Sequence, residues 1–278
     1  MKYADLHVHT YYSDSTFSPE EVVTCARDKA LSAVAICDHD CVDGIDPCIE
    51  LGGPMGVEIV PGIELTVERP AAEIHILGYF IDYRQDWFLS KLRAIRQSRV
   101  DRIHKMVGKL SEMNVKINAE DVFKLAGKGS VGRLHLAQAM LKAGVIKSIR
   151  EAFDKYIGYL ESCYVTKLNF TPEEAISSIL KLGGVPVLAH PNVLGRDEYI
   201  PGLIACGLKG IEVYHSDHKN EAVRKYERIA EENALLMTGG SDCHGMGKGR
   251  ILLGRVRIPY TVVENLRRKS EDIRRGNG

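Results

Sequence analysis

Short apolar runs alternate with stretches of helical periodicity along most of the chain. The apolar runs, many of them rich in β-branched residues, predict strands near residues 3–9, 32–37, 57–60, 63–67, 73–81, 185–189, 210–214 and 235–239. Ser18 and Thr171 are each followed by proline and two acidic residues, which is typical of a helix N-terminus. They predict one helix over about 19–30 and another that ends near Gly183. Strands that alternate with helices indicate an α/β protein with a parallel sheet or barrel.

Residues 86 to about 160 break this alternation. Their apolar residues recur at helical spacing with no strand pattern between them: Phe88, Leu92, Ile95, Ile103, Val107 and Leu110. We therefore expect a helical subdomain over 86–160, inserted into a barrel domain made of 1–85 and 161–278. Within the insertion, a glycine-rich turn leads into Arg133 and His135 at an expected helix start.

The composition is that of a globular protein. Of 278 residues, 45% are hydrophobic and 27% are charged, and no apolar run approaches the roughly 20 residues that a membrane-spanning helix needs. The seven cysteines lack C-x-x-C spacing, which fits a reducing compartment better than a disulfide framework. The N-terminus also lacks the apolar stretch of a signal peptide. We expect a cytoplasmic protein that does not bind membranes.

The net charge of zero conceals a strong polarity along the chain. Residues 1–90 contain 5 Lys and Arg against 16 Asp and Glu, whereas residues 91–150 contain 14 against 4. The acidic, histidine-rich first segment suggests bound cations. The basic middle segment suggests an anionic partner, although a solvated helix face would show the same excess. The insertion has few aromatic residues and no RRM or KH signature, so we do not expect a stable complex with nucleic acid.

Histidines and carboxylates gather near the ends of the expected strands, where barrel enzymes build their sites. His7 and His9 are separated by one residue, so on a strand both side chains leave the same face and can hold one ion together. Such a pair alone is more often two ordinary histidines. Seven further groups repeat the placement: Asp14, His39, Glu64, His75, His190, Asp242 and His244. Their convergence would be costly without cations, and nitrogen and oxygen ligands without cysteine fit Mn, Fe or Zn.

The chain resembles the polymerase and histidinol phosphatase (PHP) family of metal-dependent phosphoesterases over nearly its whole length. The family's motifs stand here as Asp5-Leu6-His7-Val8-His9-Thr10, Cys37-Asp38-His39-Asp40, Ala189-His190-Pro191 and Ser241-Asp242-Cys243-His244. The resemblance implies a distorted (β/α)7 barrel with three divalent transition metals at one end. It assigns the first metal to His7, His9, Glu64 and Asp242. Glu64 would bridge to a second metal held by His75 and His190, and Asp14, His39 and His244 would hold the third.

The length, the insertion and Gly132-Arg133-Leu134-His135 are similar to one branch of the family, which acts on 3′,5′-nucleoside bisphosphates and on short 5′-phosphorylated RNA. A small phosphorylated substrate is therefore expected. Hydrolysis of a sugar cyclic phosphate is an alternative, and histidinol phosphate is a weaker one, because Asp14 stands where that branch more often has histidine. A regulatory module that binds metal without turnover is the alternative outside enzymes. The oligomeric state is left open.

The expected mechanism uses a water that bridges two cations and supplies hydroxide at neutral pH. Glu64 and Asp242 would take part in catalysis through those cations. His218 is the candidate proton donor to the leaving oxygen; a capping role, His215 or a metal-bound water are alternatives. Arg133 and His135 are candidate phosphate contacts, with a surface arginine as the alternative. Arg196 is a further candidate substrate contact, although the residues between His190 and Arg196 depart from the branch's pattern.

Overall fold

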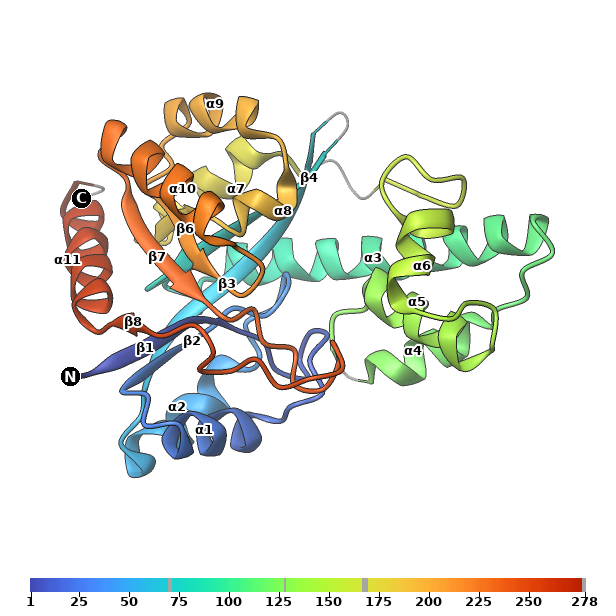
Figure 1. Cartoon of the computed structure of the whole chain (residues 1–278), viewed down its shortest axis with the longest axis horizontal. Helices are drawn as coiled ribbons and strands as arrows, with labels where there is room; N and C mark the ends of the chain where they lie inside the picture. The colour runs from blue at the N-terminus through green and yellow to red at the C-terminus, as the bar shows by residue number, and fades with distance from the viewer. Residues whose placement is uncertain (70–71, 128, 167–169, 277–278) are drawn as a thin grey trace.

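The computed structural model describes residues 1–69, 72–127, 129–166 and 170–276. Within these residues, eight strands form one sheet in the order β7-β6-β5-β4-β3-β2-β1-β8. The strands are β1 (Tyr3–Val8), β2 (Ala33–Ile36), β3 (Glu58–Arg69), β4 (Ala72–Tyr79), β5 (Val185–Leu188), β6 (Gly210–His215), β7 (Leu236–Gly240) and β8 (Ile258–Pro259). Val8 at the end of β1 bridges to Cys243 just beyond β7, so the sheet curls into a nearly closed barrel (Figure 1). The α/β barrel class expected from the sequence is confirmed.

Strand direction differs from a uniform series of βα units. The strands β1, β2 and β3 are parallel, as are β5, β6 and β7, but β4 runs antiparallel to both of its neighbours. Only residues 70 and 71 separate β3 from β4, which is too few for a crossover helix. As a result, the first residues of β4 lie at the same end of the barrel as the last residues of β3 and β5.

The two strands expected at 57–60 and 63–67 are one continuous strand, β3. Pro61 and Gly62 resemble a turn in sequence, but Gly62 serves another purpose. A Cβ atom at Gly62 would lie 2.9 Å from the carbonyl oxygen of Ile36 and 3.0 Å from the sulfur of Cys37. Glycine is therefore needed here because β2 packs closely against β3.

Helices surround the sheet and follow the capping signals in the sequence. They are α1 (Pro19–Asp28), α2 (Ile45–Met55), α7 (Pro172–Lys181), α8 (Pro191–Leu194), η2 (Asp197–Tyr199), α9 (Ile200–Ala205), α10 (Asn220–Glu232) and α11 (Thr261–Gly276). Ser18 caps α1 and Thr171 caps α7, each in a reciprocal pair with a glutamate three residues on. None of the helices in the described part of the chain has the length and apolar composition to span a lipid bilayer.

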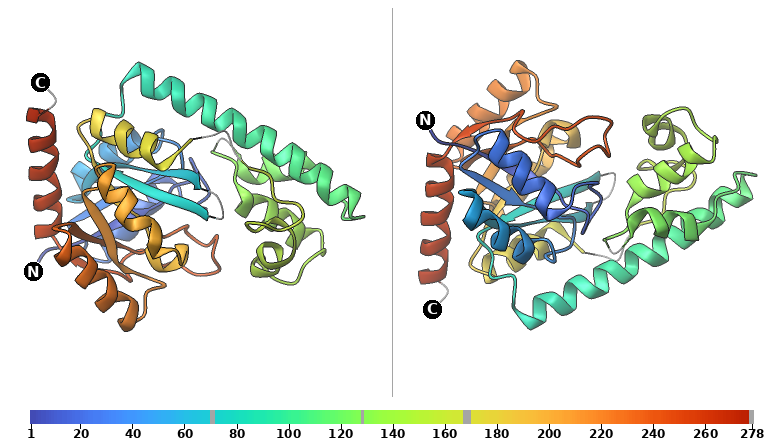
Figure 2. Two further views of the ribbon diagram at one scale, coloured as in Figure 1. Left: turned by 90° about the horizontal axis from the view of Figure 1, so that it is seen from above. Right: turned by 90° about the horizontal axis from the view of Figure 1, so that it is seen from below.

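The remaining helices form a lobe beside the barrel (Figures 1 and 2). They are α3 (Asp86–Glu112), α4 (Ala119–Ala126), α5 (Arg133–Lys142), α6 (Ile149–Ala152) and the π-helical turn η1 (Phe153–Ile157). The long helix α3 belongs to both parts. Phe88 and Leu92 in its first half pack in the barrel's outer core, whereas Met106 and Leu110 in its second half pack with the lobe. One rigid helix thus positions the lobe relative to the barrel.

An apolar core fills the barrel below the polar end. Alternate residues of β4 divide between two cores: Leu77 and Tyr79 join the inner cluster with Val60, while Ile74 and Ile76 face the surrounding helices. The Tyr79 hydroxyl donates to the carbonyl oxygen of Leu6, 2.9 Å away. His75 shares the inward face of β4 with Leu77, so the strand places this histidine above the inner core.

Candidate active site

The nine residues expected as metal ligands lie together at one end of the barrel. His7 belongs to β1 and His9 follows it, Glu64 belongs to β3 and His75 to β4, and His190 lies two residues after the end of β5. The other four come from loops after β1, β2 and β7: Asp14, His39, Asp242 and His244. Strands and loops from six parts of the chain therefore supply one cluster of imidazoles and carboxylates.

The first group within the cluster consists of His7, His9, Glu64 and Asp242, each of which offers one ligand atom within 4.8 Å of the others. The Nε2 atoms of His7 and His9 both lie 3.3 Å from Glu64 Oε2. The same two nitrogens lie 3.5 and 3.1 Å from Asp242 Oδ1. All four residues are buried. Two imidazoles and two carboxylates around one point are a suitable ligand set for a divalent cation.

Glu64 connects this group to the rest of the cluster. Its second oxygen, Oε1, lies 2.8 Å from His75 Nδ1 and 3.0 Å from His190 Nε2. Its Oε2 atom is also 3.2 Å from His39 Nδ1. The two oxygens of one carboxylate thus face different histidines, which is the geometry that a bridging ligand needs.

A further group surrounds Asp14. The Oδ1 atom of Asp14 lies 3.2 Å from His244 Nε2, and its Oδ2 atom lies 3.9 Å from His39 Nε2. His9 joins this group as well, because its Nδ1 atom faces Asp14 at 3.9 Å. The side chain of His9 therefore lies between the first group and this one.

The ligand atoms fit cations better than they fit one another. Among the described residues, His7 Nε2, Asp14 Oδ1 and Glu64 Oε2 are buried and have no hydrogen-bond partner. Leaving such an atom unsatisfied costs about 1–3 kcal/mol. Burial lowers the pKa of His9 to about 4 and that of His39 to about 3. His9 and His39 therefore have lone pairs available for a metal ion, whereas nearby carboxylates raise the pKa of His75 to about 9, so that an ion there would replace a proton.

Two buried carboxylates that sequence reasoning did not assign support the cluster from below. Glu212 Oε1 lies 3.1 Å from His7 Nδ1, and Glu212 Oε2 accepts from the His190 backbone N–H at 2.8 Å. Asp5 accepts from the backbone N–H of Ser241 at 2.8 Å, and burial raises the pKa of Asp5 to about 6. The available signal was an acidic residue within an otherwise apolar strand, as in Ile211-Glu212-Val213.

Two of the proposed ligands have a strained backbone conformation. His190 has φ 26° and Asp242 has φ 52°, values that non-glycine residues rarely adopt. Each such residue costs about 1–3 kcal/mol, which the surrounding contacts must offset. Gly240, just before Asp242, has no room for a side chain, because a Cβ atom there would lie 2.3 Å from His7 Cβ. The end of β7 is thereby held against β1.

A cavity of about 370 Å³ opens over the cluster, and the helical lobe forms its opposite wall. Three arginines from the lobe line it: Arg99 and Arg102 of α3 and Arg133 at the start of α5. Leu134, Ile149, Phe153 and Val193 add an apolar surface. Arg133 was predicted from sequence as a candidate phosphate contact, whereas Arg99 and Arg102 were noticed only as part of a basic segment. Their position opposite the histidine cluster makes the cavity attractive to a substrate with more than one negative charge.

Each arginine contacts a carboxylate of the barrel. Arg99 Nε donates to Asp40 Oδ2 at 2.8 Å, and Arg133 Nη2 donates to Glu73 Oε1 at 2.6 Å. Arg102 Nη2 lies 3.6 Å from Glu68 Oε1. Lys248, also unassigned from sequence, lines the cavity on the side of the cluster and donates to Asp242 Oδ2 at 2.6 Å.

Two candidate substrate contacts lie away from this cavity. His135 is buried, and its Nδ1 atom accepts from the backbone N–H of Gly132 at 3.1 Å, so it caps α5. Arg196 is largely exposed and lies 3.4 Å from Glu198. Neither is among the residues that line the cavity, whereas Arg133 is. The glycine turn therefore directs Arg133 into the cavity, whereas His135 lines a neighbouring pocket together with Asp14.

The candidate proton donor His218 lies behind His215. Its Nδ1 atom is 2.8 Å from the carbonyl oxygen of Val213, and its ring centroid is 5.2 Å from that of His215. His215 is closer to the cluster, with Nε2 at 3.6 Å from Asp242 Oδ2. Neither His218 nor His215 is among the cavity-lining residues, so the role of His218 in proton transfer stays a prediction.

This barrel and its polar end define a metal-dependent phosphoesterase, and comparisons with known proteins agree. Residues 5–165 match the PHP domain. The 3′,5′-nucleoside bisphosphate phosphatase of Chromobacterium violaceum is 29% identical over 255 residues, which cover 90% of each chain. A phosphoribosyl 1,2-cyclic phosphate 1,2-diphosphodiesterase of Eggerthella lenta is 30% identical over 275 residues, 92% of this chain and 98% of the relative.

Among solved structures, a protein named as a metal-dependent phosphoesterase from Bifidobacterium adolescentis superimposes with a TM-score of 0.87. It is 32% identical, and the match covers 96% of both chains. The chain belongs to the PHP domain family. It is an enzyme that hydrolyses phosphate esters, and both the family and the enzyme class expected from the sequence are confirmed.

Proposed function

We propose that this enzyme removes phosphate from nucleotides, either the 3′-phosphate of 3′,5′-nucleoside bisphosphates or a phosphate ester of short 5′-phosphorylated oligoribonucleotides. One observation carries the proposal. A single cavity has the histidine and carboxylate cluster on one wall and Arg99, Arg102 and Arg133 on the other. A substrate with two phosphates can place one on each wall at the same time, which a simple monophosphate cannot do.

The cluster would hold three divalent transition metals, Mn, Fe or Zn, in the groups given by the distances above. His7, His9, Glu64 and Asp242 would hold one, Glu64 with His75 and His190 a second, and Asp14, His39 and His244 a third. Nitrogen and oxygen ligands suit all three metals. When bound, these ions would acidify a water molecule and neutralise charge on the phosphate oxygens. In this proposal Glu64 and Asp242 act by orienting the ions toward the substrate.

The lobe's residues would bind and orient the rest of the substrate. Arg133 presents a planar guanidinium that can hold a phosphate by two hydrogen bonds, and Arg102 lies beside it on the same wall. Phe153 of the lobe and Val193 of α8 on the barrel supply an apolar surface for the nucleoside and exclude water from it. Binding energy from this remote phosphate would position the reacting one.

The leaving sugar oxygen needs a proton, and histidine suits this task near neutral pH. His215 contacts Asp242 directly, whereas His218 reaches the cluster through His215. Neither ring lines the cavity, and the contact with Asp242 is the observation that favours His215 over His218 as the donor.

A turnover panel tests the proposed substrate class. It compares 3′,5′-adenosine bisphosphate, a 5′-phosphorylated dinucleotide, a ribose cyclic phosphate and histidinol phosphate, each with Mn²⁺. The relative named as a nucleoside bisphosphate phosphatase supports the first substrate, and the relative named as a cyclic phosphate diphosphodiesterase is the reason for the third. We expect the highest kcat/KM for one of the first two. A higher value for the cyclic phosphate or for histidinol phosphate would contradict the proposal.

A further inference from the structure

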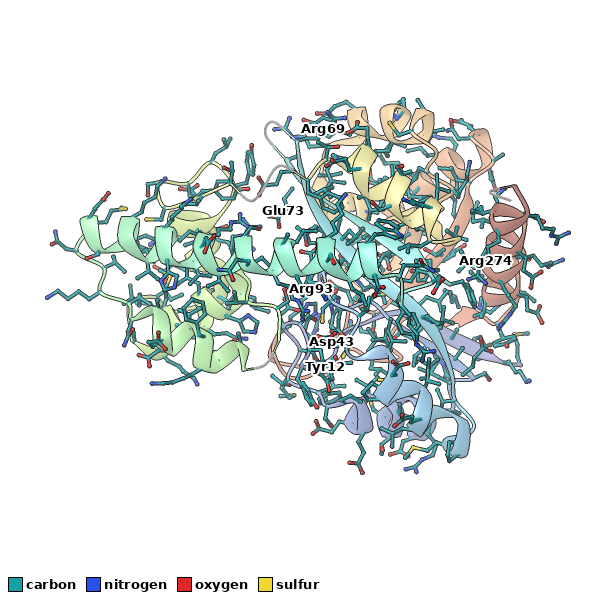
Figure 3. All side chains as sticks on the ribbon, turned by 180° about the vertical axis from the view of Figure 1, so that it is seen from behind. Tyr12, Asp43, Arg69, Glu73, Arg93 and Arg274 are labelled. Atoms are coloured by element: carbon teal, nitrogen blue, oxygen red, sulfur yellow. The ribbon has the colours of Figure 1, made fainter. Side chains whose placement is uncertain are left out.

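Glu73 lies between the two walls of the cavity and contacts both. It is the second residue of β4, and Figure 3 shows it between the barrel and the helical lobe. Its Oε1 atom accepts from Arg133 Nη2 at 2.6 Å and also lies 3.3 Å from His75 Nε2. Its Oε2 atom lies 3.7 Å from Arg102 Nη1. One carboxylate therefore touches a proposed metal ligand and two proposed phosphate contacts.

The two ring nitrogens of His75 face different partners: one faces the cluster and the other faces Glu73. The Nδ1 atom of His75 faces the cluster, 2.8 Å from Glu64 and 3.2 Å from His190. Its Nε2 atom faces Glu73. When ionised, the Glu73 carboxylate accepts hydrogen bonds and cannot donate one. If an ion occupies the Nδ1 side, where Glu64 lies, the proton of a neutral His75 is on Nε2, and Glu73 is placed to accept a hydrogen bond from it. A carboxylate in this position also makes the imidazole a stronger ligand.

The strand and the lobe together fix this arrangement. Glu73 and His75 are two residues apart on β4, so both side chains leave the same face. Arg133 is held by a second hydrogen bond from Nη1 to the Ile157 carbonyl oxygen at 3.3 Å, and its guanidinium lies 5.4 Å from the Phe153 ring centroid. The side chains of Arg133 and Glu73 are only 14% and 15% exposed. A buried pair of this kind is coupled more strongly than an exposed one.

We propose that Glu73 is a positioning residue that couples metal binding to phosphate binding. Arg133 and His75 share the Oε1 atom of Glu73. When the Arg133 guanidinium is bonded to Oε1, it therefore reduces the negative charge that His75 experiences. When Arg133 turns to a substrate phosphate, Oε1 of Glu73 no longer shares its charge with Arg133, and the carboxylate strengthens the hold of His75 on the ion. This coupling rests on the proposed function, which assigns His75 to a metal and Arg133 to a phosphate.

A double-mutant cycle on metal affinity tests the coupling without any turnover. Mn²⁺ binding to chelator-treated protein is measured by calorimetric titration for the wild type, Glu73→Gln, Arg133→Met and the double variant. We expect Glu73→Gln to weaken Mn²⁺ binding roughly 10-fold or more, because it loses the charged partner of His75. Arg133→Met should tighten Mn²⁺ binding roughly fivefold. The double variant should match Glu73→Gln alone, because without the carboxylate Arg133 has no route to the metal.

Controls separate this route from the general effect of charge. Glu68→Gln removes a carboxylate that contacts Arg102 but no proposed metal ligand, and it should leave Mn²⁺ affinity unchanged. Arg133→Lys keeps the charge and loses the planar fork, so it should tighten binding less than Arg133→Met. If Arg133→Met does not fold, Arg133→Lys replaces it in the cycle. Circular dichroism verifies the fold of each variant.

The possible outcomes have distinct meanings. If Arg133→Met shifts Mn²⁺ affinity equally with and without Glu73, the charge acts through space and the coupling is overturned. No shift in either background overturns it as well. Both results leave the metal site itself intact. Wild-type protein that binds no Mn²⁺ would instead contradict the proposed function.

Discussion

The two walls of the cavity are built in different ways. The ligand wall comes from strand ends of the barrel, and several of its buried atoms, such as His7 Nε2 and Glu64 Oε2, have no hydrogen-bond partner among the described residues. The arginine wall comes from helices of the lobe, and Arg99 and Arg133 each already donate to a carboxylate of the barrel. The first wall is therefore incomplete without cations, whereas the second is mostly paired: Arg99 and Arg133 have carboxylate partners, and Arg102 Nη2 is buried without a hydrogen-bond partner among the described residues.

This difference separates what each wall contributes. An incomplete wall binds its ions strongly, because the cost of its buried polar atoms is relieved only on binding. Arg99 and Arg133 must exchange one anionic partner for another, so their net gain on binding a phosphate is smaller. We expect the ligand wall to decide whether the enzyme works and the arginine wall to decide which substrate it prefers. The following predictions test that division, beginning with the largest effect.

Removing the metals should abolish turnover on every substrate. Treatment with a chelator leaves the buried ligand atoms unpaired, so activity should fall to background and return on addition of Mn²⁺. Unfolding should also become easier, with Tm lower by about 5–10 °C than in saturating metal. Activity assays and thermal melts with and without chelator check both effects. Full activity in protein that contains no transition metal by elemental analysis would contradict the ligand wall's role.

Glu64→Gln should have the largest effect of any single substitution. The amide has one oxygen and no charge, so it cannot face two groups of histidines as the carboxylate does. We expect metal content to fall and turnover to drop by more than the 10–100-fold that loss of a supporting partner costs. Glu50→Gln makes the same chemical change at an exposed position on α2 and should keep metal and activity. Normal metal content in Glu64→Gln would contradict the prediction that Glu64 bridges two metal ions.

The gathering of the ligand wall's residues at one end of the barrel could be predicted from sequence, because these residues share a recognisable placement. Histidines and carboxylates at the ends of apolar runs have few other reasons to recur, and the barrel brings strand ends together wherever the strands lie in the sequence. The direction of β4 could not be predicted in this way. Alternation of apolar residues has the same pattern for either direction, so nothing local showed that His75 enters the site from the start of its strand.

Of the arginine wall, only Arg133 was predicted as an individual residue, and Arg99 and Arg102 were not. Arg99 and Arg102 are three residues apart and share a helix face, but the sequence does not say what that face meets. The packing of the lobe against the barrel determines what this helix face contacts: Arg99 meets Asp40, and Arg102 meets Glu68. Locally similar residues also separate: Arg133 reaches the cavity, while His135 two residues later caps its own helix.

Arg133→Ala should change substrate preference more than catalysis itself. The variant loses a charge-assisted contact to the remote phosphate, which is worth about 1.5–3 kcal/mol. We expect kcat/KM for 3′,5′-adenosine bisphosphate to fall roughly 10–100-fold, which is that energy as a rate ratio. The loss on p-nitrophenyl phosphate, which has one phosphate, should be much smaller. Equal losses on both substrates would show that Arg133 acts on the reacting phosphate or only on structure.

His218→Asn should have the smallest effect, because His218 reaches the cluster only through His215. A proton donor must come within hydrogen-bond reach of the leaving oxygen. His218 Nδ1 instead faces the Val213 carbonyl oxygen, and its ring packs behind that of His215.

We therefore expect His218→Asn to keep its metal and to lose less than about tenfold in turnover, equally for a nucleotide and for p-nitrophenyl phosphate. His215→Asn is the matched comparison and should slow the nucleotide more, because nitrophenolate leaves without a proton and a sugar alkoxide does not. Steady-state rates on both substrates, with metal content measured beside them, distinguish the two histidines. A loss of roughly 10²-fold in His218→Asn that is confined to the nucleotide would instead support His218 as the proton donor, as the sequence predicts.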